Sequence, residues 1–236
     1  MMSDEIKMYR RDIEKIIIES GLAERSGGLL YSSYETLRKG DWYFLGQNPG
    51  GEIDSEDEYD KIIKHIYNSD PCFNAYFDEK WEDKQGRICS AGSQHHQVNI
   101  KKFFSILGVD LRETCSSNLS FVRSRTTQSY SGSLLKDAKL CWKVHQYLLN
   151  IVRPKNILCN GSKASDFILR NMKNVKYALH QKKKVSNKLT CYSYVGDLLL
   201  SNTDKPLTNV RLFSVPHLGI YRCYPEAAQW VSSLAQ

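Results

Sequence analysis

Residues 41–51 read DWYFLGQNPGG, a short aromatic and aliphatic run that ends in amides, proline and glycine. The apolar residues 42–45 predict a buried strand, because an apolar run of this length bounded by turn residues is typical of a strand covered on both faces. The composition of the remainder predicts a rigid turn. Gln47 and Asn48 are therefore expected directly after the carboxyl end of a buried strand.

Three further apolar segments are expected to be strands, each followed by a polar turn. They are residues 114–122, 156–159 and 210–215. Amphipathic patterns predict helices at residues 5–19, 99–108, 137–152, 163–172 and 225–234. The alternation of strands with helices predicts a three-layer α/β/α sandwich around a central, mostly parallel four-stranded sheet.

The length of 236 residues fits a single domain over residues 1–236. Within it, residues 1–38 are expected to form an N-terminal helical segment, and residues 173–209 an insertion. No apolar run approaches the ~18 residues that a membrane helix needs, and the N-terminus lacks the pattern of a signal peptide. These features predict a monomer in the cytoplasm that does not enter a membrane.

The seven cysteines are scattered and include no Cys-x-x-Cys pair. Zinc and iron–sulfur sites usually need such a pair, so the cysteines are expected to be reduced and buried. His95 and His96 are adjacent, and adjacent side chains diverge on a helix or strand. Neither a metal nor a cofactor is predicted.

The net charge of +7 is unevenly distributed along the chain. Residues 1–60 hold seven Lys and Arg against fourteen Asp and Glu, whereas residues 153–188 hold ten basic residues and one acid. The basic segment, which includes Lys182, Lys183 and Lys184, predicts a surface for the phosphate backbone of DNA. Arg123 and Arg125 are a second candidate for this contact. A merely solvated basic surface is the alternative.

Polar or turn residues follow each of the four predicted strands. They are Asn48, Asn118, Gly161 and His217. Ligands bind outside the carboxyl ends of strands in open parallel sheets, so these residues are expected to meet at one edge. The alternative is that each is an ordinary turn former or strand-end cap.

In their order and spacing these residues resemble the uracil-DNA glycosylase superfamily. Gly46-Gln47-Asn48-Pro49-Gly50 is similar to the first motif of the mismatch-specific and single-strand-selective branches, Gly-x-Asn-Pro-Gly. Asn118 resembles the base-reading Asn, residues 157–161 a structural strand–Gly–helix step, and His217 the His that opens the second motif. The resemblance covers about residues 40–225.

The resemblance implies a monofunctional DNA glycosylase that flips a pyrimidine-derived base out of DNA and hydrolyses its N-glycosidic bond. Asn48 would hold the attacking water, and His217 would stabilise charge on the departing base. Asn118 and Gln47 would contact the base. Phe73 or Tyr76 would stack on it, although ordinary packing is an alternative for both rings.

The same resemblance implies further contacts with DNA. Tyr221, with Ile220 beside it, would wedge into the duplex, although covering the last helix is an alternative for Tyr221. Arg222 would reach a phosphate, and Gly50 would let the turn approach closely. The chain departs from the family in reading His217-Leu218-Gly219 where His-Pro-Ser is usual, and in the acidic residues 52–60. These departures favour a modified base over uracil, as in members that act against phages with modified DNA.

Two other functions fit the sequence. A nucleic-acid-binding module of the same fold without the reaction would bind DNA in a salt-sensitive way and release no base. A hydrolase of free nucleosides would not need the basic segment.

Overall fold

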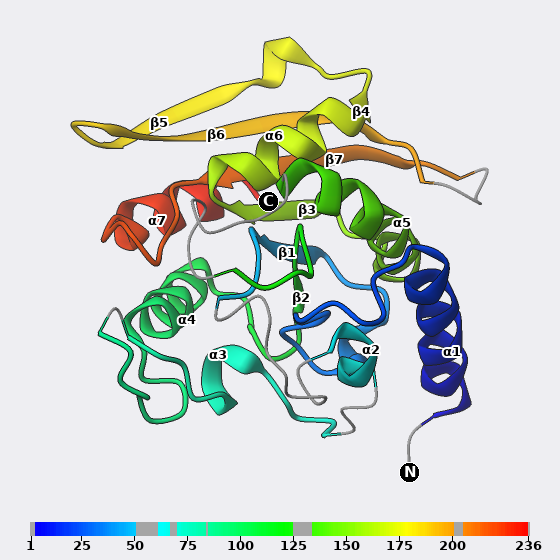
Figure 1. Ribbon diagram of the computed structural model, residues 1–236. Coiled ribbons are helices and arrows are strands. Elements are labelled where there is room, and N and C mark those ends of the chain that lie inside the picture. Colours follow the sequence, from blue (N-terminus) through cyan, green and yellow to red (C-terminus); the bar gives the residue numbers. More distant parts are fainter. Residues whose placement is uncertain are drawn as a thin grey trace.

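Four parallel strands form the centre of the protein (Figure 1). They are β1 (Trp42–Gly46), β2 (Cys115–Asn118), β3 (Asn156–Asn160) and β7 (Leu207–Val215), arranged in the order β2-β1-β3-β7. The computed structural model describes residues 3–50, 61–66, 70–83, 85–124, 134–200 and 205–235. The four predicted strands and their parallel arrangement are confirmed.

The sheet is larger than the expected four strands, because three antiparallel strands extend it to seven. They are β4 (Met172–Lys173), β5 (Gln181–Ser186) and β6 (Leu189–Leu198). β6 pairs with β7, and both β4 and β5 pair with β6. The segment expected as an insertion thus continues the sheet. β5 is polar and exposed, so it lacks the apolar pattern by which a strand is recognised.

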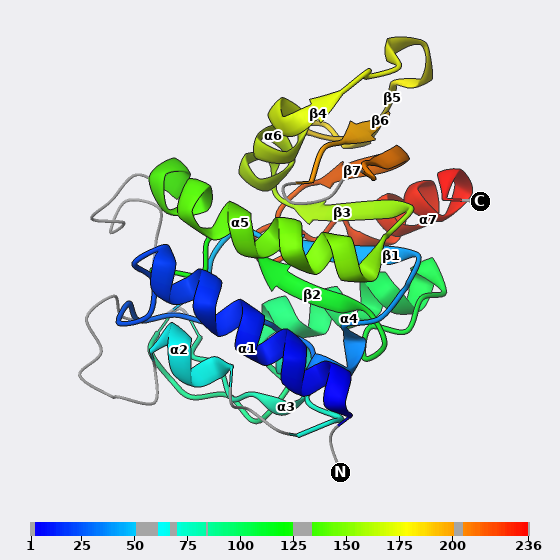
Figure 2. The same cartoon turned by 90° about the vertical axis from the view of Figure 1, so that its right-hand side faces the viewer.

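Helices cover both faces of the sheet, which confirms the three-layer arrangement (Figure 2). One face carries α1 (Asp4–Glu19), α5 (Leu134–Val152) and α6 (Ser162–Asn171), and the other carries α4 (His95–Leu107) and α7 (Tyr224–Leu234). The alternation of side chains along the strands divides the core in two: Tyr43 and Leu45 pack towards α5, whereas Phe44 packs towards α4. The short helices are α2 (Ile62–His65) and α3 (Ala75–Asp78).

Helix α4 begins four residues before the expected start at residue 99. Gln94 caps it, accepting a hydrogen bond from the backbone nitrogen of His96, while the side chain of Gln97 accepts from the backbone nitrogen of Gln94 at 3.1 Å. This capping box satisfies amides that would otherwise lack partners. It also places His95 and His96 in the first turn of the helix.

Residues 26–31 run alongside β2 and the segment that follows it. Gly27 bridges to Val122 and Leu30 to Ser117, both antiparallel. The backbones approach so closely at Gly27 that an added Cβ would lie 1.9 Å from the carbonyl oxygen of Phe121. Only glycine fits this position without a shift of the backbone.

Replacing Gly27 with alanine is therefore expected to lower the free energy of unfolding by about 1–3 kcal/mol. The matched control is Gly28→Ala, where the nearest atom to a new Cβ is Cε1 of His65 at 3.5 Å, an ordinary contact. Urea unfolding of both variants tests the difference. Equal losses of stability in the two variants would contradict it.

No helix in the part of the chain that the structure describes is long and apolar enough to cross a membrane.

Candidate functional site

Polar residues meet at the carboxyl edge of the parallel strands, as the sequence predicts. Register pairs the last residue of β1, Gly46, with Asn118, and the last residue of β3, Asn160, with Val215. Each strand therefore ends at the same level of the sheet. The chain leaves this level through Gln47 and Asn48 after β1, Gly161 after β3 and His217 after β7. We call these residues, together with Asn118, the edge cluster.

Asn48 has its side-chain amide held in one orientation. Its Nδ2 donates to the carbonyl oxygens of Pro49 at 2.8 Å and Ser124 at 3.3 Å. Both partners are acceptors, so the amide nitrogen must face them and Oδ1 must face the other way. Among the described residues, that oxygen accepts one long contact, from Nε2 of Gln47 at 3.4 Å. Asn48 thus presents a fixed acceptor that can hold a water molecule.

Asn118 is buried at the end of β2, with only 4% of its surface exposed. Its Nδ2 has no hydrogen-bond partner among the described residues. Gly46 makes room for it, because a Cβ at residue 46 would lie 2.0 Å from Oδ1 of Asn118. A buried amide without a partner is unusual and marks a place where a ligand can supply the missing acceptor.

His217 lies against a second imidazole. Its ring centroid is 4.9 Å from that of His96, with the two planes at 37°. Burial lowers the pKa of His217 below its ordinary value of 6.5 and lowers the pKa of His96 to about 3. Both rings are therefore neutral at neutral pH. Nδ1 of His217 is buried and has no partner among the described residues.

Gly219 leaves room for two histidine rings. A Cβ at residue 219 would lie 2.8 Å from Cγ of His96 and 2.9 Å from Cε1 of His217. Any residue with a Cβ, including the serine of the motif that the sequence resembles, would therefore collide with both rings. The contact between His96 and His217 therefore depends on glycine at residue 219.

Two asparagines hold the peptide of Leu218 from both sides. Oδ1 of Asn160 accepts from its nitrogen at 2.8 Å, and Nδ2 of Asn99 donates to its oxygen at 2.7 Å. Nδ2 of Asn160 also lies 2.9 Å from Nε2 of His96. Because that Nδ2 can only donate, Nε2 of His96 accepts and its proton is on Nδ1. The backbone after His217 is thus fixed by α4 and β3.

Asn99, Asn160 and His96 are missing from the residues that the sequence suggested for the site. Asn160 carried a signal, since it is the last polar residue of β3 before Gly161. His96 carried none beyond the adjacent pair, whose side chains do diverge: Nε2 of His95 lies 3.1 Å from Nδ2 of Asn99. Only the contact between α4 and the turn after β7 brings His96 to the site.

Replacing Asn160 with alanine is expected to lower the free energy of unfolding by about 1–3 kcal/mol, because two buried polar atoms lose their partner. Asn160→Asp keeps an acceptor for the nitrogen of Leu218 but loses the donor to His96. It should recover part of the stability and shift the nitrogen-15 resonances of His96. Denaturant unfolding and histidine nitrogen-15 spectra measure both. Unchanged stability of the alanine variant would contradict the role of this clamp.

Tyr76 and Phe73, the two candidates for a stacking ring, lie in different places. Tyr76 is buried, with its ring 5.7 Å from that of Phe44, 5.6 Å from that of Trp81 and 6.4 Å from that of His96. Tyr76 therefore packs next to His96, the ring that lies against His217, and the neighbouring rings hold its own ring in place.

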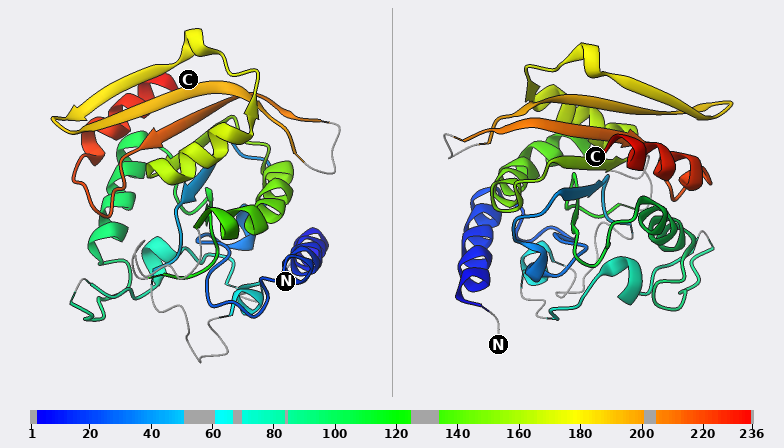
Figure 3. Two further views of the ribbon diagram at one scale, coloured as in Figure 1. Left: turned by 45° about the horizontal axis from the view of Figure 1, so that its top comes forward. Right: turned by 180° about the vertical axis from the view of Figure 1, so that it is seen from behind.

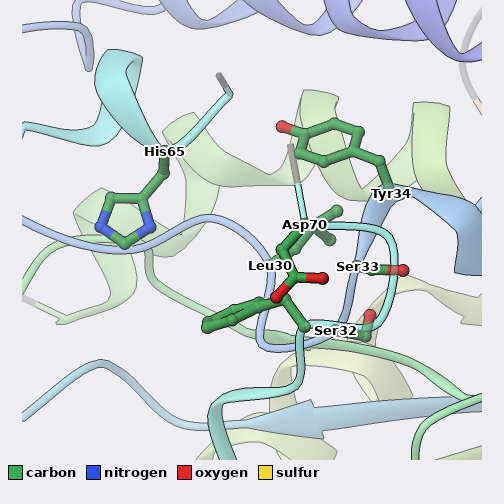
Figure 4. A pocket seen from close by; sticks show the side chains of 7 residues that line it. Leu30, Ser32, Ser33, Tyr34, His65 and Asp70 are labelled. Atoms are coloured by element: carbon green, nitrogen blue, oxygen red, sulfur yellow. The ribbon is translucent and has the colours of Figure 1, made fainter. Parts of the chain in front are cut away.

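Phe73 lines a pocket instead. The other lining residues, which Figure 4 labels, are Leu30, Ser32, Ser33, Tyr34, His65 and Asp70. Ser32 accepts from the backbone nitrogen of Ser116 at 3.0 Å, near the start of β2. This pocket is thus near the end of β2 opposite Asn118 and includes no residue of the edge cluster.

The turns beside the edge cluster hold most of the other candidates for DNA contact. Arg123 donates to the carbonyl oxygen of Gly50 at 2.5 Å and so ties down the turn that carries Asn48. The backbone nitrogens of Ile220 and Tyr221 both donate to the oxygen of His217, at 2.9 and 3.0 Å. Their side chains are 63% and 41% exposed, and Arg222 is exposed beside them. Two large apolar side chains thus project to solvent directly after His217.

The basic residues of 153–188 do not form one surface. Arg153 donates to the backbone oxygens of Lys205 and Pro206, and Lys155 pairs with Asp41 at 2.9 Å. Both precede β3 and lie at the opposite edge from Gly161. Lys182, Lys183 and Lys184 are exposed on β5. Arg125 and the acidic residues 52–60 lie outside the described residues.

No group of three metal-ligating side chains occurs within the described ranges. Comparison of the chain with protein-family models and with curated proteins gave no match.

Proposed function

We propose that the protein is a monofunctional DNA glycosylase that flips out a uracil-like or, in preference, a modified pyrimidine base and hydrolyses its N-glycosidic bond. One observation carries the proposal: Nδ2 of Asn118 and Nδ1 of His217 are buried and have no partner among the described residues, on the edge that also presents the fixed amide of Asn48. Native proteins rarely leave such atoms unpaired. A base with carbonyl and ring-nitrogen edges would supply the missing partners.

Each residue has a part in the proposed reaction. Oδ1 of Asn48 accepts a hydrogen bond from a water below the sugar carbon. The glycosidic bond breaks towards an oxocarbenium-like sugar, the base takes the electron pair, and the water adds to the sugar carbon and loses a proton to solvent. Asn118 reads the edge of the base. Neutral His217 donates to the base oxygen on which charge develops. The product is an abasic site.

The preference for a modified base is supported by two departures of the sequence from the motif that it resembles. Gly219 replaces the serine of the related motif, and the acidic residues 52–60 follow the turn of Asn48. A hydroxylated substituent would offer hydrogen bonds to such carboxylates. This pattern supports a role in defence against phages with modified DNA.

The proposal includes DNA as the partner, a monomeric protein and a cytoplasmic location. The location is supported by the seven unpaired cysteines, five of which are buried. Such cysteines are typical of reducing compartments.

The test is to incubate the protein with single- and double-stranded oligonucleotides that contain uracil or phage-type modified pyrimidines. Alkali-labile strand breaks and a mass spectrum of released bases identify the reaction and its substrate. Salt-sensitive binding without release on any DNA would instead favour a binding module without the reaction. Release from free nucleosides alone would favour a nucleoside hydrolase.

A further inference from the structure

We propose that the outer face of the β5–β6 hairpin binds a single strand of nucleic acid by stacking its unpaired bases. This tyrosine–lysine face consists of His180, Lys182, Lys184, Tyr192 and Tyr194. The hairpin lies at the outer side of the sheet in both views of Figure 3. Binding here needs no residue of the edge cluster, so the inference stands whether or not base release occurs.

Three rings on this face lie nearly parallel. The ring of His180 is 4.7 Å from that of Tyr194 at 7°, and 6.1 Å from that of Tyr192 at 12°. The two tyrosine rings are 6.5 Å apart at 19°. His180 is exposed, and Tyr192 is 36% exposed. Parallel, solvent-accessible rings offer the flat surfaces on which unpaired bases stack.

Lysines flank the rings on the same side of the sheet. Lys182 is paired with Tyr192 and Lys184 with Thr190, and residues directly opposite in an antiparallel pair share a face. Lys183 is paired with Cys191, which belongs to the core beneath α7, so Lys183 points to the other face. None of these three lysines forms an ion pair with a described residue. Their charges are available to phosphates.

Two carboxylates lie near this face. Asp166 of α6 is close enough to Tyr194 to raise the pKa of that phenol further, beyond the larger effect of burial. Asp197 is occupied, accepting from Nδ2 of Asn174 at 2.8 Å and from the nitrogen of Asn209 at 2.9 Å. The end of the hairpin that carries Lys182 and Lys184 remains positive.

This chemistry favours a single strand over a duplex or a protein. In a duplex the base faces are covered by stacking, so rings on a protein surface gain nothing from them, whereas lysines attract either form. The face is also joined to the edge cluster through the sheet. Tyr192 pairs with Ser214, three residues before His217. At ~3.3 Å per residue that separation along β7 is about 10 Å, so one strand can span both regions.

The test is fluorescence anisotropy of labelled oligothymidylate with the full chain. Tyr192→Ala is expected to weaken binding at least about fivefold, since stacking of a base on one ring contributes at this level. Tyr192→Phe keeps the ring and should bind as the wild type. Lys182→Ala with Lys184→Ala should weaken binding and reduce its salt dependence. Lys183→Ala, the same change on the opposite face of the same strand, should do neither.

Two probes separate stacking from charge. An oligonucleotide of abasic sugar phosphates should bind more weakly than oligothymidylate. Its affinity should be the same for the wild type and for Tyr192→Ala. Parallel titrations with oligouridylate and with duplex DNA identify the strand, and the duplex should show no loss in the tyrosine variant. Equal binding of abasic and base-containing strands, or equal effects of Lys183→Ala and the double lysine variant, would overturn the proposal. Circular dichroism melting checks that each variant is folded.

Discussion

Asn48→Ala is expected to slow base release at least about a hundredfold in a single-turnover assay, because the water loses the acceptor that positions it. The structure makes the expectation specific: two hydrogen bonds from Nδ2, to the oxygens of Pro49 and Ser124, fix where Oδ1 points. Alanine removes this oxygen. The backbone of the turn keeps the hydrogen bond from the nitrogen of Ser124 to the oxygen of Pro49 at 2.9 Å.

The matched control is Asn150→Ala, which removes an exposed asparagine from α5, away from the edge cluster. It should leave the rate unchanged. His217→Ala should cost about 10²–10³ in rate, the effect of removing one donor to developing charge. The assigned role would be excluded if the Asn48 variant released the base as fast as the wild type does from the same DNA.

The rate should also show no histidine inflection between about pH 6.5 and 8. Burial holds the pKa of His217 below its ordinary value of 6.5, so the midpoint of its titration lies below this range. A pH–rate profile, measured on a DNA from which the wild type releases a base, tests this. A step near neutral pH that disappears in His217→Ala would contradict a neutral His217.

The free energy of unfolding is expected to fall by about 3 kcal/mol or more as the pH drops from about 6.5 to 4. The cause is that two histidines, His96 and His145, are held neutral in the folded protein. The side chain of His145 is fully buried. Its Nε2 lies 3.2 Å from the carbonyl oxygen of Leu119 and its Nδ1 lies 2.8 Å from the hydroxyl of Tyr43. The carbonyl requires a proton on Nε2, so Nδ1 accepts from Tyr43.

Burial lowers the pKa of His145 to about 4 and the pKa of His96 to about 3. In the unfolded chain both take up protons near pH 6.5. Between pH 6.5 and the lowered pKa values, the unfolded state binds more protons than the folded state. The free energy of unfolding is therefore highest above pH 6.5 and falls as the pH drops below it.

Urea unfolding at several pH values measures this slope. His145→Gln removes one of the two titrating histidines and should reduce the slope between pH 6.5 and 4 by about half, whatever its effect at neutral pH. His180→Gln, at an exposed histidine, is the control and should leave the slope unchanged. Parallel slopes for the wild type and His145→Gln would contradict the prediction.

The four parallel strands and most helices could be predicted because their patterns are local. The apolar run before Gly46 and the helical spacing in residues 137–152 each need only a few neighbouring residues to be recognised. β5 escaped prediction because Lys182, Lys183 and Lys184 offer no apolar face; its hydrogen bonds to β6 define it. The start of α4 depended on the capping box of Gln94 and Gln97, which the apolar pattern does not report.

The functional site likewise contains residues that the sequence predicts and residues that it does not. Asn48, Asn118 and His217 could be placed at one edge because parallel strands end at the same level. His96 could not, because its contact with His217 requires α4 to pack beside the turn after β7. The basic segment looked like one surface along the chain, yet Arg153 contacts the backbone of Lys205 and Pro206, and Lys183 lies on the other face of β5 from Lys182 and Lys184.

The sequence by itself determined the α/β class, the four parallel strands and the polar residues that follow each of them. These follow from periodicities of two and 3.6 residues and from turn composition, all of which act over short stretches of chain. Only the tertiary structure decided that two neutral histidines lie against each other, that Gly219 makes room for them, and that the tyrosines and two lysines of the hairpin share a face. Such contacts join residues far apart in the chain, and strand order, register and close packing set them.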